Sequence, residues 1–245
     1  MDLLREASSG EAPQALLLVA PGCPHCAGVL ESLGTLVKEG ALSRLEVVNV
    51  AVDPTAANAL SVRSVPWVRI GMFDFIGLHT LAELRHWTEM ASREDGMTAF
   101  LGELLATGRR HEVTRRIGTN PALLTRLVDL LGDPDTALSI RIGVMATLEE
   151  FAGASTLDDL VAPLEALTGH AAPRVRADAC HALALTGATG AIDALRRCLK
   201  DPDPEVHETA ADGIASLTEA QASAQRGGRK QQGMDAVSGS VSEDP

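Results

Sequence analysis

Apolar residues in the first ninety positions come in short runs that polar and turn-forming residues separate. Four of these runs have the length of β-strands, and they occupy residues 15–20, 45–51, 67–71 and 73–76. The segments after the first, second and fourth run predict helices, the last two of them over residues 53–61 and 80–91. The resulting order of strand, helix, strand, helix, strand, strand, helix predicts a small α/β domain.

Beyond residue 119 the apolar residues recur three and four positions apart, which is the period of amphipathic helices. Residues 172–183 align with residues 203–214 at an offset of 31, with proline, valine, alanine and an aliphatic residue in register. A less regular copy precedes them, in which Arg141 takes the position that Arg176 takes later. A repeat of about thirty residues with two helices in each unit predicts an all-α solenoid.

Residues 93–119 connect these two parts. Within them, residues 97–107 predict an amphipathic helix whose apolar stripe buries against the first repeat and stiffens the junction. The residues of this stripe are Phe100, Leu101, Leu104 and Leu105. From residue 221 onward large apolar residues nearly vanish, so we expect residues 221–245 to be a disordered tail.

The motif Cys23-Pro24-His25-Cys26 directly follows the first predicted strand and opens the first predicted helix. Unsatisfied N–H groups at a helix N-terminus carry partial positive charge and favour a thiolate there. Cys23 is expected at the exposed end of the helix and Cys26 one turn deeper. One sulfur can then attack a substrate disulfide, and the other can resolve the mixed disulfide that forms. The motif therefore predicts thiol chemistry.

About forty residues later, Val65-Pro66-Trp67 precedes the third predicted strand. Together with the CxxC motif and the element order, this sequence resembles the thioredoxin superfamily in its small, glutaredoxin-sized form, over residues 12–92. The resemblance implies that the Val65–Pro66 bond is cis, faces the cysteines and borders the substrate. The residues it places at the substrate are Pro24, Val65, Pro66 and Trp67, although the Trp67 ring could instead pack on the sheet.

The inner Pro-His dipeptide is that of the DsbA-type disulfide oxidases. This resemblance implies that Cys23 is the nucleophile, that Cys26 is the resolving thiol, and that His25 helps to lower the pKa of Cys23. The redox-active pair itself is the only cofactor implied. The chain departs from thioredoxins at Gly22, where they carry tryptophan, and at Leu17, where they carry a buried acid. Deprotonation of Cys26 would then need another base or water.

The stretch 187–204 is similar to the HEAT-like repeats of many scaffold proteins, and the similarity extends over about residues 120–218. It implies a surface that binds a protein partner. The expected organisation is a thioredoxin-like domain, a helical bridge, a HEAT-like repeat domain and a tail. Their boundaries are residues 1–92, 93–119, 120–220 and 221–245.

Charge and composition narrow the class of partner. The net charge is −12, and residues 120–220 alone carry −9, which argues against nucleic acid and anionic membrane surfaces and favours a basic protein partner. The first ten residues lack the features of a signal peptide, and no apolar run approaches the ~20 residues that span a bilayer. We therefore expect a cytoplasmic protein. Cys180 and Cys198 fall on apolar helix positions and are expected in the core.

These observations predict a thiol–disulfide oxidoreductase that acts on protein thiols and disulfides, with Cys23, Cys26 and His25 at its centre and a repeat domain that selects the client. The alternative is an interaction scaffold without turnover. Its CxxC would then be a redox sensor or a weak metal site, since one such motif supplies half of a tetrahedral zinc site.

Overall fold

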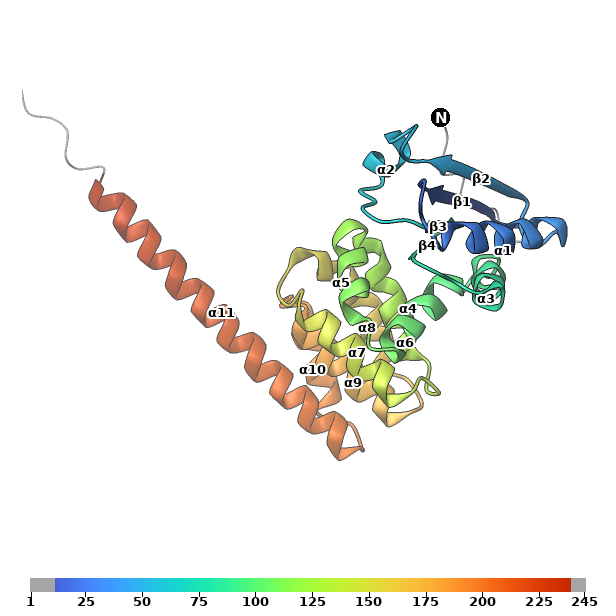
Figure 1. Cartoon of the computed structure of the whole chain (residues 1–245). Coiled ribbons are helices and arrows are strands. Elements are labelled where there is room, and N and C mark those ends of the chain that lie inside the picture. Colours follow the sequence, from blue (N-terminus) through green and yellow to red (C-terminus); the bar gives the residue numbers. More distant parts are fainter. Residues whose placement is uncertain (1–11, 239–245) are drawn as a thin grey trace, which may run out of the picture. The chain divides into compact units, whose positions relative to one another are not determined.

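The computed structural model describes residues 12–238, with side chains described for most of them. The chain divides into two compact units, Met1–Phe100 and Leu101–Pro245. The first is a small mixed α/β unit and the second is helical (Figure 1). The N-terminal residues 1–11, on which the expectation of no signal peptide rests, lie outside the described residues, as do residues 239–245 of the predicted tail.

One four-stranded sheet forms the centre of the first unit. Its strands are β1 (Gln14–Val19), β2 (Arg44–Asn49), β3 (Trp67–Ile70) and β4 (Phe73–Ile76), in the order β2-β1-β3-β4. Strands β1 and β2 are parallel, whereas β1–β3 and β3–β4 are antiparallel. A parallel pair needs a long crossover connection, which the helix α1 (Cys26–Lys38) supplies. The predicted strands are thus confirmed within one or two residues at each end.

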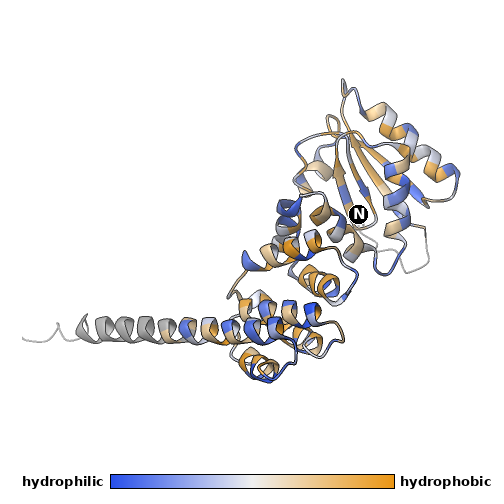
Figure 2. Cartoon of the chain, turned by 90° about the horizontal axis from the view of Figure 1, so that it is seen from below, coloured by the Kyte–Doolittle hydropathy of each residue, from blue (hydrophilic) through white to orange (hydrophobic). Residues whose placement is uncertain are grey.

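The two faces of the sheet carry separate apolar cores, because neighbouring residues of a strand point to opposite faces. On one face Leu16, Leu18 and Trp67 pack with Ala56 and Ala57 of the short helix α2 (Thr55–Ala59). The opposite face presents residues such as Leu17 and Val68, and helices α1 and α3 (Leu81–Ala91) lie on it. The strands are correspondingly apolar in Figure 2.

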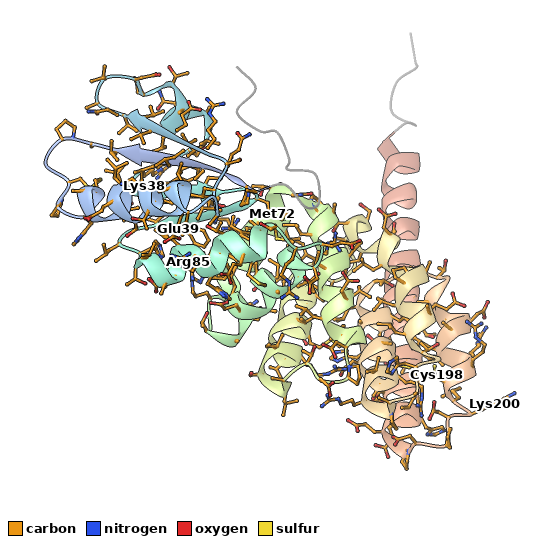
Figure 3. All side chains as sticks on the ribbon, turned by 90° about the vertical axis from the view of Figure 1, so that its right-hand side faces the viewer. Lys38, Glu39, Met72, Arg85, Cys198 and Lys200 are labelled. Atoms are coloured by element: carbon orange, nitrogen blue, oxygen red, sulfur yellow. A yellow bond between two sulfur atoms is a disulfide. The ribbon has the colours of Figure 1, made fainter. Side chains whose placement is uncertain are left out.

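Helix α3 begins where the sequence has a capping box. The Thr80 hydroxyl accepts a hydrogen bond from the Glu83 N–H, and the Glu83 carboxylate accepts one from the Thr80 N–H. These hydrogen bonds lower the pKa of Glu83. Helices α1 and α3 are also linked by an ion pair between Glu39 and Arg85, at 2.6 Å, whose side chains point toward one another in Figure 3.

Phe100 corrects the prediction for the connecting segment. It lies on α4 (Gly96–Ala106), but its ring stacks on Phe73 with centroids 4.6 Å apart and meets the Trp87 ring at 5.0 Å. Phe100 thus belongs to the aromatic core of the first unit and not to the first repeat. A ring of this size is buried most completely among the other large rings of that core.

The rest of the apolar stripe of α4 packs as predicted. Leu101, Leu104 and Leu105 are buried within the second unit. A Cβ atom on Gly143 would lie 3.1 Å from the Leu105 side chain, so the absence of a side chain at residue 143 allows the close approach of Leu105.

The second unit consists of successive short helices. They are α5 (Arg110–Thr119), η1 (Pro121–Leu123), α6 (Leu124–Gly132), α7 (Leu138–Glu149), η2 (Ser155–Leu160), α8 (Val161–Leu167), α9 (Pro173–Leu185), α10 (Ala191–Cys198) and α11 (Pro204–Ser238). Helix α9 packs against α8, α10 and α11 (Figure 1). Helix α11 includes residues 221–238, for which the sequence predicts no order; a helix pairs its own backbone N–H and C=O groups, so the scarcity of large apolar residues does not prevent it.

Equivalent arginines of successive repeats have equivalent contacts. Arg141 and Arg176 are each the fourth residue of their helix, and each donates to a carbonyl in the loop before that helix: Asp133 for Arg141 and His170 for Arg176. Their distances to these carbonyl oxygens are 3.1 and 3.0 Å. The repeat seen in the sequence is therefore also a repeat of loop-closing hydrogen bonds.

Candidate functional site

Cys23 and Cys26 are joined in a disulfide between the end of β1 and the start of α1. The chain turns directly after β1, and the Cys23 N–H donates to the Ala20 carbonyl at 3.4 Å. Gly22 has φ of 75°, a left-handed conformation that side chains rarely adopt. This turn accounts for glycine at the position where thioredoxins carry tryptophan.

The two sulfur-bearing residues differ in exposure. Cys26, the first residue of α1, is 7% exposed, whereas Cys23 in the preceding turn is half-buried. Pro24 and His25 between them are exposed, and His25 occupies the N-cap position without capping the helix through its side chain. Cys23 is thus the more accessible member of the pair, and His25 stands next to it in solvent.

The Val65–Pro66 peptide bond is cis, which confirms the prediction. It immediately precedes β3, whose first residue Trp67 pairs with Leu18 near the end of β1. The cis bond and the cysteines therefore both lie at the edge of the sheet where β1 ends and β3 begins. The Pro66 carbonyl accepts a hydrogen bond from the Gly77 N–H at 2.9 Å, which fastens the loop after β4 beside it.

Of the two roles left open for Trp67, the structure favours packing. Its side chain is 3% exposed within the core cluster on the α2 face of the sheet. The guanidinium of Arg69 lies 5.0 Å from the ring centroid and covers it further. The indole therefore supports the sheet beneath the cis bond and does not line a groove.

Leu17 is fully buried in the middle of β1, paired with Val68 on one side and Val47 on the other. The position where thioredoxins carry a buried acid thus belongs to the apolar core of this unit. No carboxylate from that position can take the Cys26 proton.

A second pair of cysteines lies in the helical unit, and no pattern in the sequence predicts that its members meet. Cys180 of α9 and Cys198 at the end of α10 are free thiols that are 0% and 5% exposed; Cys198 is labelled in Figure 3. A hydrogen bond between the two thiols, together with burial, raises the pKa of Cys180. The same hydrogen bond, helped by the Thr168 hydroxyl, lowers the pKa of Cys198. Their predicted place in the core is confirmed.

Metal and membrane sites have no support among residues 12–238. Among the side chains that the structure describes, no three from His, Cys, Asp or Glu gather closely enough to hold a metal ion. Likewise, no helix there combines the length and apolar character needed to cross a bilayer.

Comparison with known families identifies one match. Residues 160–225 match the family model described as HEAT repeats, which covers α8 to the first part of α11. The less regular copy before residue 160 lies outside the match. No curated protein matches the chain. HEAT repeats form stacked surfaces that bind proteins, so this part of the chain indicates a protein-interaction role.

Proposed function

We propose that the chain is a thiol–disulfide oxidoreductase in which a thioredoxin-like unit exchanges disulfides with a protein that the helical unit binds. The observation that carries the proposal is the pair at the start of α1: a half-exposed Cys23 bonded to a buried Cys26. An accessible sulfur can attack a client, and a buried partner close by can release it.

The surroundings of the pair support this assignment. The element order agrees with the resemblance to the thioredoxin superfamily, and a cis proline precedes β3 at the same edge of the sheet as the cysteines. The N-terminus of the thirteen-residue α1 favours negative charge on the sulfur of Cys23. The exposed His25 beside it would add to this effect when protonated.

The exchange transfers two electrons. The Cys23 thiolate attacks one sulfur of the client disulfide, forms a Cys23–client disulfide and releases the other client sulfur as a thiolate. The Cys26 thiolate then attacks the Cys23 sulfur, closes the Cys23–Cys26 disulfide and releases the second client sulfur. The client gains the two electrons and the Cys23–Cys26 dithiol loses them; the reverse sequence oxidises a client.

Proton transfer at Cys26 distinguishes this chain from a thioredoxin. With Leu17 in place of the acid, we assign the Cys26 proton to water or to the departing client thiolate. Cys26 must lose this proton before it can attack Cys23, and a smaller fraction of a thiol is deprotonated as the pH falls, so this step slows turnover most at low pH. In a cytoplasmic setting, cellular thiols would keep the pair reduced and favour reduction or isomerisation of clients.

Insulin reduction by dithiothreitol tests the proposal. We expect the wild-type chain to accelerate precipitation of the insulin B chain and Cys23→Ser to return the rate to that of dithiothreitol alone. The double variant Cys180→Ala/Cys198→Ala is the matched control and should retain the wild-type rate. If the wild-type chain does no better than Cys23→Ser, the redox-sensing scaffold is the correct description.

A further inference from the structure

A groove of about 400 Å³ crosses the surface of the helical unit. Helix α7 forms one wall, α9 forms the other, and Glu205 at the start of α11 closes one part of its rim. Every lining residue comes from the second unit, so the groove is independent of the cysteine site.

The wall formed by α7 is apolar and open to solvent. Leu138 is 69% exposed and Ile142 is 59% exposed, and Met145 lies below them. These three residues follow one another at intervals of four and three, so they form a stripe about 10 Å long on one face of the helix. Large apolar side chains this exposed are uncommon in the described part of the helical unit: the other is Leu199, outside the groove.

The rim of the groove is acidic. Within the described residues, Glu149 and Glu205 have no ion-pair partner, whereas the charge of Arg141 is neutralised by Asp178 across the groove. Arg174 is the remaining lining cation. The next two turns of α11 add the exposed Glu208 and Asp212, of which Asp212 shares a helix face with Glu205.

The walls also limit the backbone of an occupant. Beyond the N–H groups of their first turns, the backbone N–H and C=O groups along α7 and α9 are paired within their helices, so they offer no row of partners to an extended strand. A bound segment must therefore satisfy its own backbone, as a helix does. Apolar residues of such a helix at positions i and i+4 would match the spacing of Leu138 and Ile142.

We propose that this groove binds an amphipathic helix of a protein partner that carries two large apolar residues one turn apart and lysine or arginine beside them. The apolar pair covers Leu138 and Ile142, and the basic residues face Glu149 and Glu205. The inference deepens the proposed function, because the partner would be the client; binding itself requires no thiol.

Selection from a phage-displayed library of cysteine-free helical peptides on the full-length chain tests this site. We expect the enriched peptides to share two apolar residues three or four positions apart and a positive net charge. Fluorescence anisotropy of the synthesised peptides then gives their Kd. A selection that enriches no peptide, or enriches acidic ones, would overturn the proposal.

Matched variants locate the binding. Ile142→Ser should weaken binding about tenfold, whereas Leu199→Ser, which also removes an exposed aliphatic side chain, should change Kd less than about twofold. The pair Glu149→Lys/Glu205→Lys should weaken it by a similar factor, and Asp158→Lys/Asp159→Lys, with the same change of net charge, should not. Equal losses in the variants and their controls would contradict a site in this groove.

The test separates the groove from the dithiol. Peptide binding to Cys23→Ser should equal that of the wild type, and Ile142→Ser should keep the wild-type rate of insulin reduction. If dithiol exchange fails while the groove variants lose binding, only the proposed redox function is wrong. If insulin is reduced but the groove variants bind normally, only the groove assignment is wrong.

Discussion

The two units each hold a pair of cysteines, and the pairs differ in almost every physical respect. Cys23 and Cys26 are three residues apart, bonded, and located where a strand turns into a helix. Cys180 and Cys198 are free and buried where α9 and α10 pack together. The first pair is held by local chain geometry, whereas the second depends on the packing of two helices.

The comparison shows that the reactivity expected of a cysteine thiol depends on its structural surroundings. A turn before a helix leaves Cys23 partly exposed to solvent and next to the positive end of α1. Helix packing removes Cys180 and Cys198 from water, where a small polarisable thiol is a core side chain. Some charged groups differ in the same way: in the helical unit the Arg141–Asp178 and Arg176–Asp201 pairs are largely shielded from solvent, whereas the Glu39–Arg85 and Arg44–Glu46 pairs of the first unit are more exposed.

The largest expected effect is on thiol reactivity. After reduction of the native chain, iodoacetamide should alkylate Cys23 at least about a hundredfold faster than Cys180 or Cys198, because the latter two become accessible only through local opening. Mass spectrometry of timed samples measures the three rates. Alkylation in urea provides the control, since all four thiols should then react at similar rates. Similar alkylation rates for Cys23, Cys180 and Cys198 in the native chain would contradict this difference between the two pairs.

The next largest effect is a difference in stability between variants of a partly buried and of an exposed ion pair. Asp201→Asn leaves Arg176, which donates to Asp201 at 2.8 and 2.7 Å, without its charge partner; because this pair is partly buried, the change should cost about 2 kcal/mol of unfolding free energy. Glu39→Gln breaks the exposed pair with Arg85 and should have no measurable effect. Urea unfolding followed by circular dichroism compares the two. If Glu39→Gln loses more unfolding free energy than Asp201→Asn, the expected order of the two ion pairs is wrong.

Acid should weaken the same partly buried pair. The hydrogen bonds from Arg176 lower the pKa of Asp201 from its ordinary value of 3.8. The pKa of Asp201 is thus lower in the folded than in the unfolded state. The ionised carboxylate therefore contributes its full stabilisation above the ordinary value, and this stabilisation is lost as the pH falls through the folded-state pKa. The stability difference between wild type and Asp201→Asn should therefore be constant near pH 7 and shrink below about pH 4. A difference that stays constant down to pH 2 would exclude this carboxylate as the cause.

The smallest expected effect concerns His25. If its charge and the helix N-terminus together lower the pKa of Cys23, alkylation of Cys23 should already be fast below the ~8.5 of a free thiol. His25→Ala should then slow alkylation at pH 7 about threefold and shift the pH profile upward. His86→Ala, another exposed histidine of the same unit, is the control. If the pH profile of Cys23 alkylation is unchanged in His25→Ala, His25 does not lower the pKa of Cys23.

Much of the architecture followed from local patterns in the sequence. The strands, the helix that starts at the cysteines and the helical repeats all appear where the spacing of apolar residues predicts them. The identity of Val65–Pro66 as cis came from the family resemblance, since nothing local distinguishes it from other X–Pro bonds. The sequence alone predicts that the two cysteines of the CxxC motif lie close together, because only three positions separate them.

Tertiary packing decided what local patterns leave open. Phe100 had the spacing of a residue that faces the repeats, yet it joins the aromatic core around Phe73. Trp67 could have faced a client and instead lies under Arg69. The contact of Cys180 with Cys198, and the groove between α7 and α9, depend on residues from different helices. Periodicity fixes which face of an element is apolar, but only packing determines which element covers that face and which part of it remains exposed.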